Sequence, residues 1–276
     1  MKILVAGAGG QLGQALPQAL HGHVVEAFVR AQLDITQLTA VRAVIERTEP
    51  DLVINAAAYN RVDEAERDPL AAYRGNALGP RNLAVITAAH GIPLLHVSTD
   101  YVFAGTSTRP YHEFDCTNPE SVYGESKLAG EEAVRMLNAR HYIARTAWLY
   151  NVMGQNFPKT MCRLAQQQPE VRVVNDQHGS PTYVPHLAEA LARLITTQAY
   201  GTYHLAGNGG TSWYDFTCLL YRLLNIETPV RPVTTADFPR PAKRPAYSVL
   251  TTIQEPHILL PAWEEGVQQF ADAIRT

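Results

Sequence analysis

The sequence predicts an α/β fold: a doubly wound parallel sheet of the Rossmann type with a smaller, discontinuous lobe. Two observations carry this prediction. Strand-like and helix-like segments alternate through the first 150 residues, and the strand-like segments are continuously apolar. Strands have this composition when helices cover both faces of a parallel sheet. The right-handed crossover between parallel strands then favours a doubly wound topology.

Each element of this first part has its own signal. A helix within 36–50 shows apolar residues at helical spacing and stops at Pro50. A helix within 76–91 ends at Gly91, and one within 118–138 has Asn118 as a plausible N-cap. The five apolar runs expected to form strands are KILVA, HVVEAF, DLVINAAAYN, IPLLHVSTD and HYIARTAWLY.

The alternation weakens after about residue 150. Segments 171–184 and 201–207 still have strand character, with a helix at 185–197 between them, and are expected to extend the same sheet. The other segments are richer in proline and turn residues. The expected division is a Rossmann domain from 1–150 and 171–206, and a second lobe from 151–170 and 207–276 over the carboxyl ends of the strands.

Bulk properties exclude several classes of protein. The net charge is −3 and the sequence pI is about 6.4, so neither a nucleic-acid binder nor a membrane-surface binder is indicated. No apolar run reaches the roughly 18 residues of a membrane span, and no signal peptide is recognised. Three cysteines without metal-ligand spacing indicate reduced thiols and a cytoplasmic protein. The ten histidines form no metal motif, so no metal site is expected.

A glycine-rich loop indicates dinucleotide binding. Gly7, Gly10 and Gly13 follow the first predicted strand and open a predicted helix. Such a loop lets the backbone approach a pyrophosphate, and the helix N-terminus offers free N–H groups. The alternative is a turn needed only for strand–helix packing. At the first strand of an alternating chain we favour the dinucleotide site, which makes the Rossmann domain a cofactor domain.

The end of the second strand bears on the choice of cofactor. Val29 offers no carboxylate to a ribose 2′-hydroxyl, and Arg30 follows with a guanidinium that suits a 2′-phosphate. NADP(H) is therefore preferred, with NAD(H) as the alternative. Arg30 would otherwise be a solvated surface residue. Asp34 either reaches the adenine amino group or caps the helix that begins near Thr36.

A tyrosine and a lysine lie one helical turn apart, at Tyr123 and Lys127. An ammonium beside a phenol favours the phenolate and lowers its pKa towards neutrality, as acid–base catalysis requires. The spacing alone is weak evidence, because chance yields roughly 0.2 such pairs in this composition. Position is stronger evidence, because the pair follows a strand ending in Ser98 and Thr99, where ligands bind in open α/β sheets.

Motifs along nearly the whole chain resemble the dTDP-4-dehydrorhamnose reductase family of the extended short-chain dehydrogenase/reductase superfamily. The glycine loop and YGESK are superfamily signals. The more specific motifs are NAAAYNRVDEAE, STDYVFAG and DQHGSPT. The resemblance implies NAD(P)H-dependent reduction of the C4 keto group of dTDP-4-dehydro-6-deoxy-L-mannose to dTDP-L-rhamnose, a nucleotide sugar for cell-wall polysaccharide. Tyr123 would be the general acid, and the protein a monomer or homodimer.

The resemblance also implies a role for each matching residue. Thr99, Tyr123 and Lys127 would be catalytic. The cofactor would contact these last two and a larger set: Gly7, Gly10, Gln11, Leu12, Gly13, Arg30, Asp34, Ile35, Ala56, Ala57, Ala58, Tyr59 and Asn76. The dTDP-linked keto sugar would contact Tyr123 and a second set: Asn60, Val62, Asp63, Asp100, Tyr101, Trp148, Asn156, Gln177 and Arg244.

Departures from the family pattern fall on the substrate side. The family usually has Thr at Asn60, Asn at Tyr247 and Asp or Asn at Thr251, so the identity of the sugar stays open. Ala15 replaces a glutamate that binds Mg²⁺ at a dimer contact in some members, which argues against a metal-bridged dimer. Two alternatives remain: another sugar-nucleotide reductase or epimerase, and a non-catalytic NADP-binding subunit like that of methionine adenosyltransferase.

Overall fold

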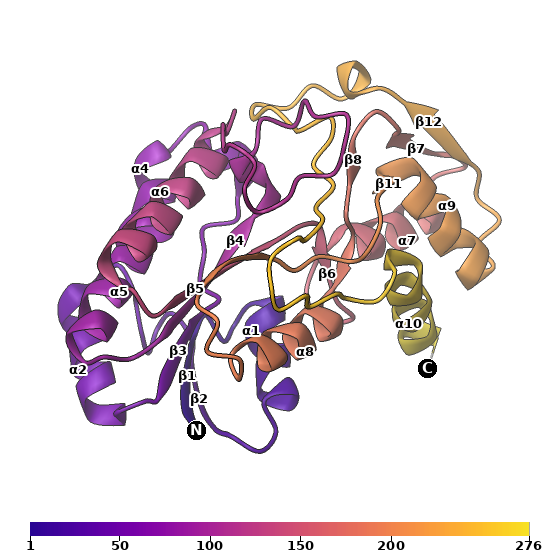
Figure 1. Ribbon diagram of the computed structural model, residues 1–276. Coiled ribbons are helices and arrows are strands. Elements are labelled where there is room, and N and C mark those ends of the chain that lie inside the picture. Colours follow the sequence, from indigo (N-terminus) through magenta and orange to yellow (C-terminus); the bar gives the residue numbers. More distant parts are fainter. Residues whose placement is uncertain (276) are drawn as a thin grey trace.

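The larger part of the molecule is built on a six-stranded parallel sheet (Figure 1). The computed structural model describes residues 1–275, and the predicted doubly wound α/β fold is confirmed. The strand order is β10-β5-β4-β3-β1-β2. The strand bounds are Lys2–Ala6 (β1), Val24–Phe28 (β2), Leu52–Asn55 (β3), Leu94–Thr99 (β4), His141–Thr146 (β5) and Gly201–His204 (β10).

Helices cover both faces of this sheet. Successive side chains of a strand point to opposite faces, so Ile3 and Val5 pack with the α1/α8 layer while Leu4 and Ala6 pack with the other layer. The first layer is α1 (Gln11–Ala19) and α8 (Val184–Leu194); the second is α2 (Leu38–Thr48), α5 (Gly79–Ala89) and α6 (Val122–Leu137). Between β3 and α5 lie α3 (Val62–Ala65), α4 (Pro69–Tyr73) and a π-helical turn η1 (Arg74–Leu78).

One predicted helix start is wrong. Asn118 is not the cap of α6, because the helix begins at Val122 and Ser121 is its N-cap. The Ser121 Oγ accepts a hydrogen bond from the Gly124 N–H at 3.2 Å. Both residue types cap helices well, so the choice depends on the tertiary path of the chain rather than on local preference.

A smaller lobe packs beside the carboxyl end of the sheet around its own apolar core, which includes Phe216 and Phe270. Its helices are α7 (Phe157–Gln167), α9 (Trp213–Leu224) and α10 (Trp263–Arg275). The expectation that 171–184 extends the large sheet is wrong. There β7 (Val171–Val174) pairs with β12 (Val230–Val233), β8 (His178–Gly179) with β11 (Thr211–Ser212), and β9 (Thr182–Tyr183) with β6 (Leu149–Tyr150). Only β10 joins the large sheet as expected.

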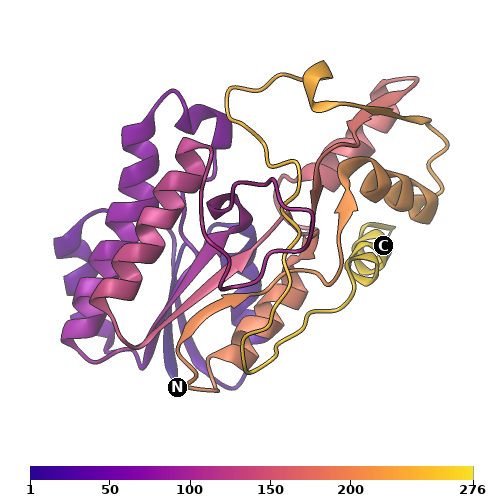
Figure 2. The same ribbon diagram turned by 45° about the horizontal axis from the view of Figure 1, so that its top comes forward.

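The chain returns from the smaller lobe to the sheet through residues 242–253, which we call the strap. Figure 2 shows this gold segment passing in front of the sheet. Its attachment includes the buried Glu113 carboxylate, which accepts from the Ile253 N–H at 3.1 Å and pairs with the Thr252 hydroxyl. The strap thereby fixes the smaller lobe to the loop that follows β4.

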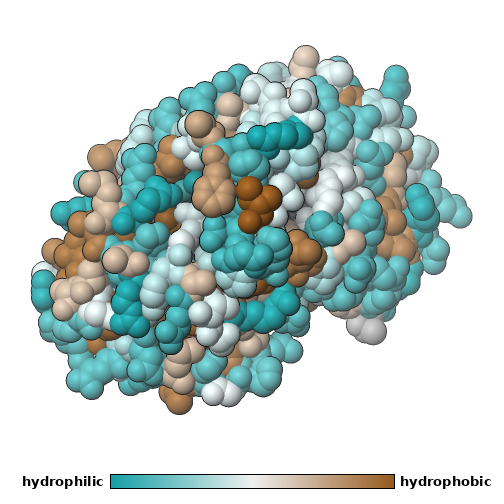
Figure 3. All heavy atoms as spheres, viewed as in Figure 1, coloured by the Kyte–Doolittle hydropathy of each residue, from teal (hydrophilic) through white to brown (hydrophobic). Residues whose placement is uncertain are grey.

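Hydrophilic residues predominate on the face of the molecule shown in Figure 3, with apolar residues scattered among them. In the part of the chain that the structure describes, no helix is long and apolar enough to cross a bilayer.

Candidate active site

The glycine loop between β1 and α1 is built for close backbone approach. Gly7 has a φ of +91°, and a Cβ on it would lie 2.5 Å from the Ala57 nitrogen. A Cβ on Gly13 would lie 2.2 Å from the Gly7 oxygen. Gly10 is the N-cap of α1, whose first turn contains no acidic residue and receives no side-chain cap. The N–H groups of this turn are therefore available to an anion such as a pyrophosphate.

A cleft of about 1040 Å³ opens beside this loop. Of the residues expected at the cofactor, those lining it are Gly7, Gly10, Arg30, Asp34, Ile35, Ala56, Ala57, Ala58 and Tyr59. Asn60, predicted to contact the sugar, lines the same cleft. The Leu12 side chain packs in the core of the α1/α8 layer, and Gly13 is buried against Gly7. Leu12 and Gly13 can therefore contact a ligand only through their backbone groups.

Arg30 and Asp34 lie together on the wall of the cleft. Arg30 Nε is 3.6 Å from Asp34 Oδ2, and the Arg30 side chain is 83% exposed. Asp34 Oδ1 accepts from both the N–H and the hydroxyl of Thr36, at 3.0 and 2.8 Å. Burial opposes ionisation of Asp34, but these hydrogen bonds and Arg30 hold its pKa below the usual value. Asp34 thus closes a turn before α2, whose own N-cap is Gln37.

Two further arginines, which the sequence patterns did not single out, also line the cleft. Arg61 follows Asn60, and Arg74 begins the π-helical turn η1. Arginines outside a recognised motif are ordinarily solvated, and only the folded chain reveals that these two border a cleft. Their charges make its outer wall favourable to phosphate groups.

The three predicted catalytic residues come together at the carboxyl end of β4. The Thr99 hydroxyl donates to Asp100 Oδ1 at 2.9 Å and lies close enough to the Tyr123 phenol to act against the rise of its pKa. Lys127 lies one turn further along α6 and is 2% exposed. Its ammonium donates to the Val97 carbonyl at 2.6 Å. A phenol, a hydroxyl and a buried cation therefore share one edge of the sheet.

The expected lowering of the Tyr123 pKa by Lys127 is not found. Burial raises the pKa of Tyr123 to about 12, with the Thr99 hydrogen bond acting against it and the Asp100 charge adding to it. Burial lowers the pKa of Lys127 to about 8, although Glu131 favours the ammonium. At neutral pH the phenol is therefore protonated and the lysine is mainly charged, which is the state that a proton donor needs.

Asn76 is fully buried and bonds both to the cleft wall and to α6. Its side-chain oxygen accepts from the Tyr59 N–H at 2.8 Å, while its amide nitrogen donates to the Tyr59 carbonyl and the Ser126 hydroxyl, both at 3.0 Å. Ser126 in turn donates to the Tyr123 carbonyl at 2.8 Å. Asn76 thus sets the position of Tyr59 relative to the helix that carries Tyr123.

A buried pair that the sequence patterns missed supports the same wall. The Asn55 amide nitrogen lies 3.0 Å from His96 Nδ1, and its side-chain oxygen accepts from the Ala57 N–H at 3.1 Å. Burial and the charge of Lys127 hold the pKa of His96 well below its usual value, so the imidazole is neutral. No local pattern signals this pair, because its members lie on adjacent strands of the sheet.

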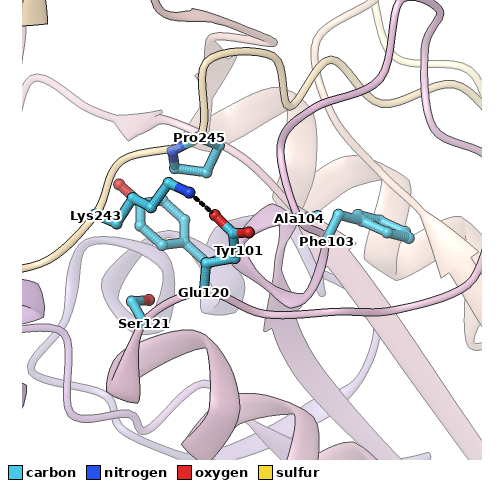
Figure 4. A pocket seen from close by; sticks show the side chains of 7 residues that line it. All are labelled: Tyr101, Phe103, Ala104, Glu120, Ser121, Lys243 and Pro245. Carbon is cyan, nitrogen blue, oxygen red and sulfur yellow. Dashed lines mark ion pairs between the residues drawn. The ribbon is translucent and has the colours of Figure 1, made fainter.

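The strap brings residues 243 and 244 next to residues that are predicted to contact the sugar. Arg244 donates to Asp63 Oδ2 at 3.0 Å, and the rings of Tyr101 and Tyr123 meet edge to face at 5.4 Å between centroids. The pKa of Tyr101, raised mainly by burial, is sensitive to the charges of both Arg244 and Asp63. Figure 4 shows Lys243 paired with Glu120 beside Tyr101. Ion pairs therefore join the strap to α3, through Asp63, and to the segment before α6, through Glu120.

The remaining predicted sugar contacts are spread along the boundary between the lobes. Val62 begins α3 next to Asn60 and Asp63, whereas Trp148 follows β5 and stacks on Trp213. Gln177 donates to the Thr235 hydroxyl at 3.0 Å. Asn156 caps α7 and donates to the Gln11 side chain at 3.1 Å, which places it beside the glycine loop. A sugar contact for these residues stays a prediction.

A search of residues 1–275 for three or more neighbouring His, Cys, Asp or Glu side chains that could hold a metal ion found none. Ala15 packs against the core of the α1/α8 layer.

Comparison with known proteins gives a consistent result. A relative from Streptomyces griseus named dTDP-4-dehydrorhamnose reductase is 46% identical over 256 residues, covering 90% of this chain and 84% of its own. A relative from Streptomyces niveus named dTDP-4-keto-6-deoxy-D-glucose reductase is 43% identical over 251 residues, covering 90% of this chain and 87% of its own.

A solved structure and a family model complete the comparison. The dTDP-4-dehydrorhamnose reductase of Bacillus anthracis, solved in complex with NADP, superposes with a TM-score of 0.96 at 40% identity, covering 100% of this chain and 99% of its own. The family model described as the RmlD substrate binding domain matches residues 1–276. The chain therefore belongs to the dTDP-4-dehydrorhamnose reductase family, as its sequence motifs predicted.

Proposed function

We propose that this protein reduces the C4 keto group of dTDP-4-dehydro-6-deoxy-L-mannose with NAD(P)H and releases dTDP-L-rhamnose. The observation that carries the proposal is the contact between Tyr123 and Thr99 at the carboxyl end of β4, beside a cleft with a glycine cradle. A binding module has no need of a protonated phenol and a hydroxyl converging at that edge. The names of the relatives supply the substrate class.

The cofactor is proposed to lie along the cleft. When bound, NAD(P)H supplies the hydride for the reduction. The N–H groups at the start of α1 bind its pyrophosphate, and Arg30 favours the 2′-phosphate of NADPH. Ala57 and Tyr59, held by Asn55 and Asn76, form the wall towards the nicotinamide side. The full set of proposed contacts is the cofactor set predicted from the sequence.

Tyr123 donates the proton to the alkoxide that develops at C4. Its pKa of about 12 keeps the phenol protonated until the proton is transferred to the substrate oxygen. Thr99 stabilises the same oxygen, as a preorganised hydroxyl beside developing charge does. Lys127 provides a buried positive charge one turn away from Tyr123 and binds the ribose of the cofactor. The phenolate left on Tyr123 is reprotonated from solvent before the next turnover.

The keto sugar is proposed to lie between the sheet and the strap. Asp100 and Tyr101 contact it from the end of β4, while Asn60, Val62 and Asp63 contact it from the loop and helix after β3. Arg244 enters from the strap, where it already pairs with Asp63. Trp148 and Gln177 complete the wall of the smaller lobe.

One assay tests the activity directly. Purified protein is mixed with dTDP-4-keto-6-deoxyglucose, a 3,5-epimerase and either NADPH or NADH, and the loss of nicotinamide absorbance is followed. Loss that depends on the 3,5-epimerase supports the proposal, and a faster rate with NADPH supports the cofactor preference. Conversion of the sugar by the protein alone, with the 3,5-epimerase left out and without net loss of absorbance, would instead indicate an epimerase.

A second substrate has a specific observation in its favour. The relative from Streptomyces niveus carries the name of a reductase of dTDP-4-keto-6-deoxy-D-glucose. Asn60 and Tyr247, both departures from the usual family pattern, lie on the sugar side or on the strap. Omitting the 3,5-epimerase from the assay separates the two, because only this second reductase would then consume NADPH.

The same proposal covers the division into domains, the cellular compartment and the oligomeric state. We propose that residues 1–150 and 171–206 hold the cofactor, and that 151–170 and 207–276 hold the sugar. The exception is the segment 171–183, whose strands β7, β8 and β9 pair within the smaller lobe. We place the reaction in the cytoplasm, where it supplies rhamnose for cell-wall polysaccharide. Light scattering of the purified protein distinguishes a monomer from a homodimer.

A further inference from the structure

Trp148 occupies a position at the edge of the site that requires unusual backbone geometry. It lies two residues beyond Thr146, which pairs in register with Thr99 at the carboxyl end of the sheet. Its φ is +48°, in the left-handed region that residues other than glycine seldom adopt. Such a conformation persists only where the surroundings hold it, and it is frequent at ligand sites.

The ring of Trp148 is held from two directions by the smaller lobe. It stacks on Trp213 with ring centroids 3.4 Å apart and an angle of 4° between the planes. It also lies against Gly179, where a Cβ would come within 2.4 Å of Trp148 Cε2. The glycine of the DQHGSPT motif therefore makes room for this indole.

Several elements of the smaller lobe meet at this stack. Gly179 in β8 pairs with Thr211 in β11, and β11 leads directly into α9, whose first residue is Trp213. Phe157, the first residue of α7, packs on Trp213 with ring centroids 4.3 Å apart. The cap of α7 is Asn156, which bonds to Gln11 in the glycine loop. The stack thus lies between the glycine loop and the end of β5.

We infer that Trp213 is a positioning residue that holds the indole of Trp148 in place as a wall for the keto sugar. Trp213 itself acts through Trp148 and need not touch the substrate. The inference rests on the proposed function for the identity of the ligand, whereas the placement of the two rings stands without it. Releasing Trp148 would leave its left-handed backbone without the ring stack that supports it.

A spectroscopic experiment tests the placement independently of activity. The chain has three tryptophans, so Trp263→Phe leaves the stacked pair as the only indoles. In that background the pair should give an exciton couplet in circular dichroism, which Trp213→Phe should abolish. Trp213→Leu should also raise the mobility of Trp148, measured as lower fluorescence anisotropy and stronger acrylamide quenching. Unchanged anisotropy and quenching in Trp213→Leu would overturn the inference.

Kinetics then test the consequence for the substrate. Trp213→Leu should raise KM for the keto sugar by about ten- to a hundredfold, the scale expected for a misplaced binding group. KM for NADPH should change less than twofold, and Trp213→Phe, which keeps an aromatic ring, should recover most of the loss. A sugar KM unaffected in a folded Trp213→Leu variant would contradict the inference. Absence of turnover in the wild type would defeat the proposed function alone, since the anisotropy test would still decide the role of Trp213.

Discussion

Arg244 donates to the carboxylate of Asp63 at 3.0 Å, although 181 positions of sequence separate them. The contact joins the strap of the smaller lobe to the helix that follows β3. Both side chains are mostly buried, at 19% and 27% exposed. The pair therefore links two segments that lie far apart in the sequence beside the predicted sugar site.

Exchanging the two charges should separate the structural from the binding role of this pair. Asp63→Asn or Arg244→Gln should each lower the free energy of unfolding by about 1 kcal/mol, the upper range for a partly exposed pair. The exchange Asp63→Arg with Arg244→Asp should restore stability in urea denaturation but not KM for the keto sugar. The more exposed pair of Lys243 and Glu120 serves as the control. Recovery of the sugar KM in the exchanged variant would mean that the pair only holds the strap.

Tyr123→Phe should remove the proton donor and little else. Turnover should fall by about 10²–10⁴-fold, the usual contribution of a positioned acid. Binding of NADPH, measured by fluorescence titration, should stay within twofold, because the ring remains packed against Tyr101. Tyr200→Phe, remote from the site, is the matched control and should retain activity. Near-normal turnover in Tyr123→Phe would sink the assignment of the acid.

Activity should decline as pH rises through about 8. The pKa of Lys127 is lowered to about 8 by burial, so the ammonium is present below that pH and is lost above it. Tyr123 stays protonated throughout, because its pKa is about 12. The measurement is kcat/KM against pH for the wild type and for Lys127→Arg, whose guanidinium does not titrate in this range. The alkaline decline should vanish in Lys127→Arg and persist in the control Lys159→Arg; a decline common to all three proteins would rule out Lys127 as its source.

Arg30→Ala should weaken the preference for NADPH. One charge-assisted hydrogen bond near solvent is worth about 1.4 kcal/mol, so KM for NADPH should rise about tenfold. KM for NADH should not change, since NADH has no 2′-phosphate. Arg42→Ala, which removes an exposed ion pair with Glu46, is the control. An equal rise for both cofactors would show that Arg30 does not read the phosphate.

Gly13→Ala should destabilise the protein even though alanine is the better helix former. The added Cβ would lie 2.2 Å from the Gly7 oxygen, so the loop must shift, at a cost of about 1–3 kcal/mol. Gly9→Ala is a matched control for stability, because its Cβ would meet Val29 at 3.7 Å, an ordinary contact. Equal midpoints of urea denaturation for the two variants would contradict the packing explanation.

Local patterns in the sequence were sufficient for the large sheet and the glycine loop. Continuous apolar runs indicate strands buried on both faces, and Gly13 is needed by a backbone contact close in sequence, with Gly7. The meeting of Thr99 with Tyr123 also follows from topology, because Thr99 ends β4 and Tyr123 lies in the first turn of α6, the crossover helix that starts at the same edge of the sheet. The chemistry of the site was therefore predictable where order along the chain determines position in space.

Partners that depend on distant segments were not predictable in the same way. No pattern in the apolar run of β7 predicts that it pairs with β12 rather than with a strand of the large sheet. The Tyr123 pKa was expected to follow Lys127, but burial by the surrounding fold has the larger effect. The stacking of Trp148 on Trp213 depends on the pairing of β8 with β11, which brings two remote turns together.

The long span between Asp63 and Arg244 has a consequence for biosynthesis. A nascent chain folds from its N-terminus, so the glycine loop and Tyr123 are made long before the strap. Until residue 244 has left the ribosome, Asp63 lacks its cationic partner. A partly synthesised chain can thus form the cleft beside the glycine loop first, whereas the strap is fixed to α3 only after Arg244 has been added.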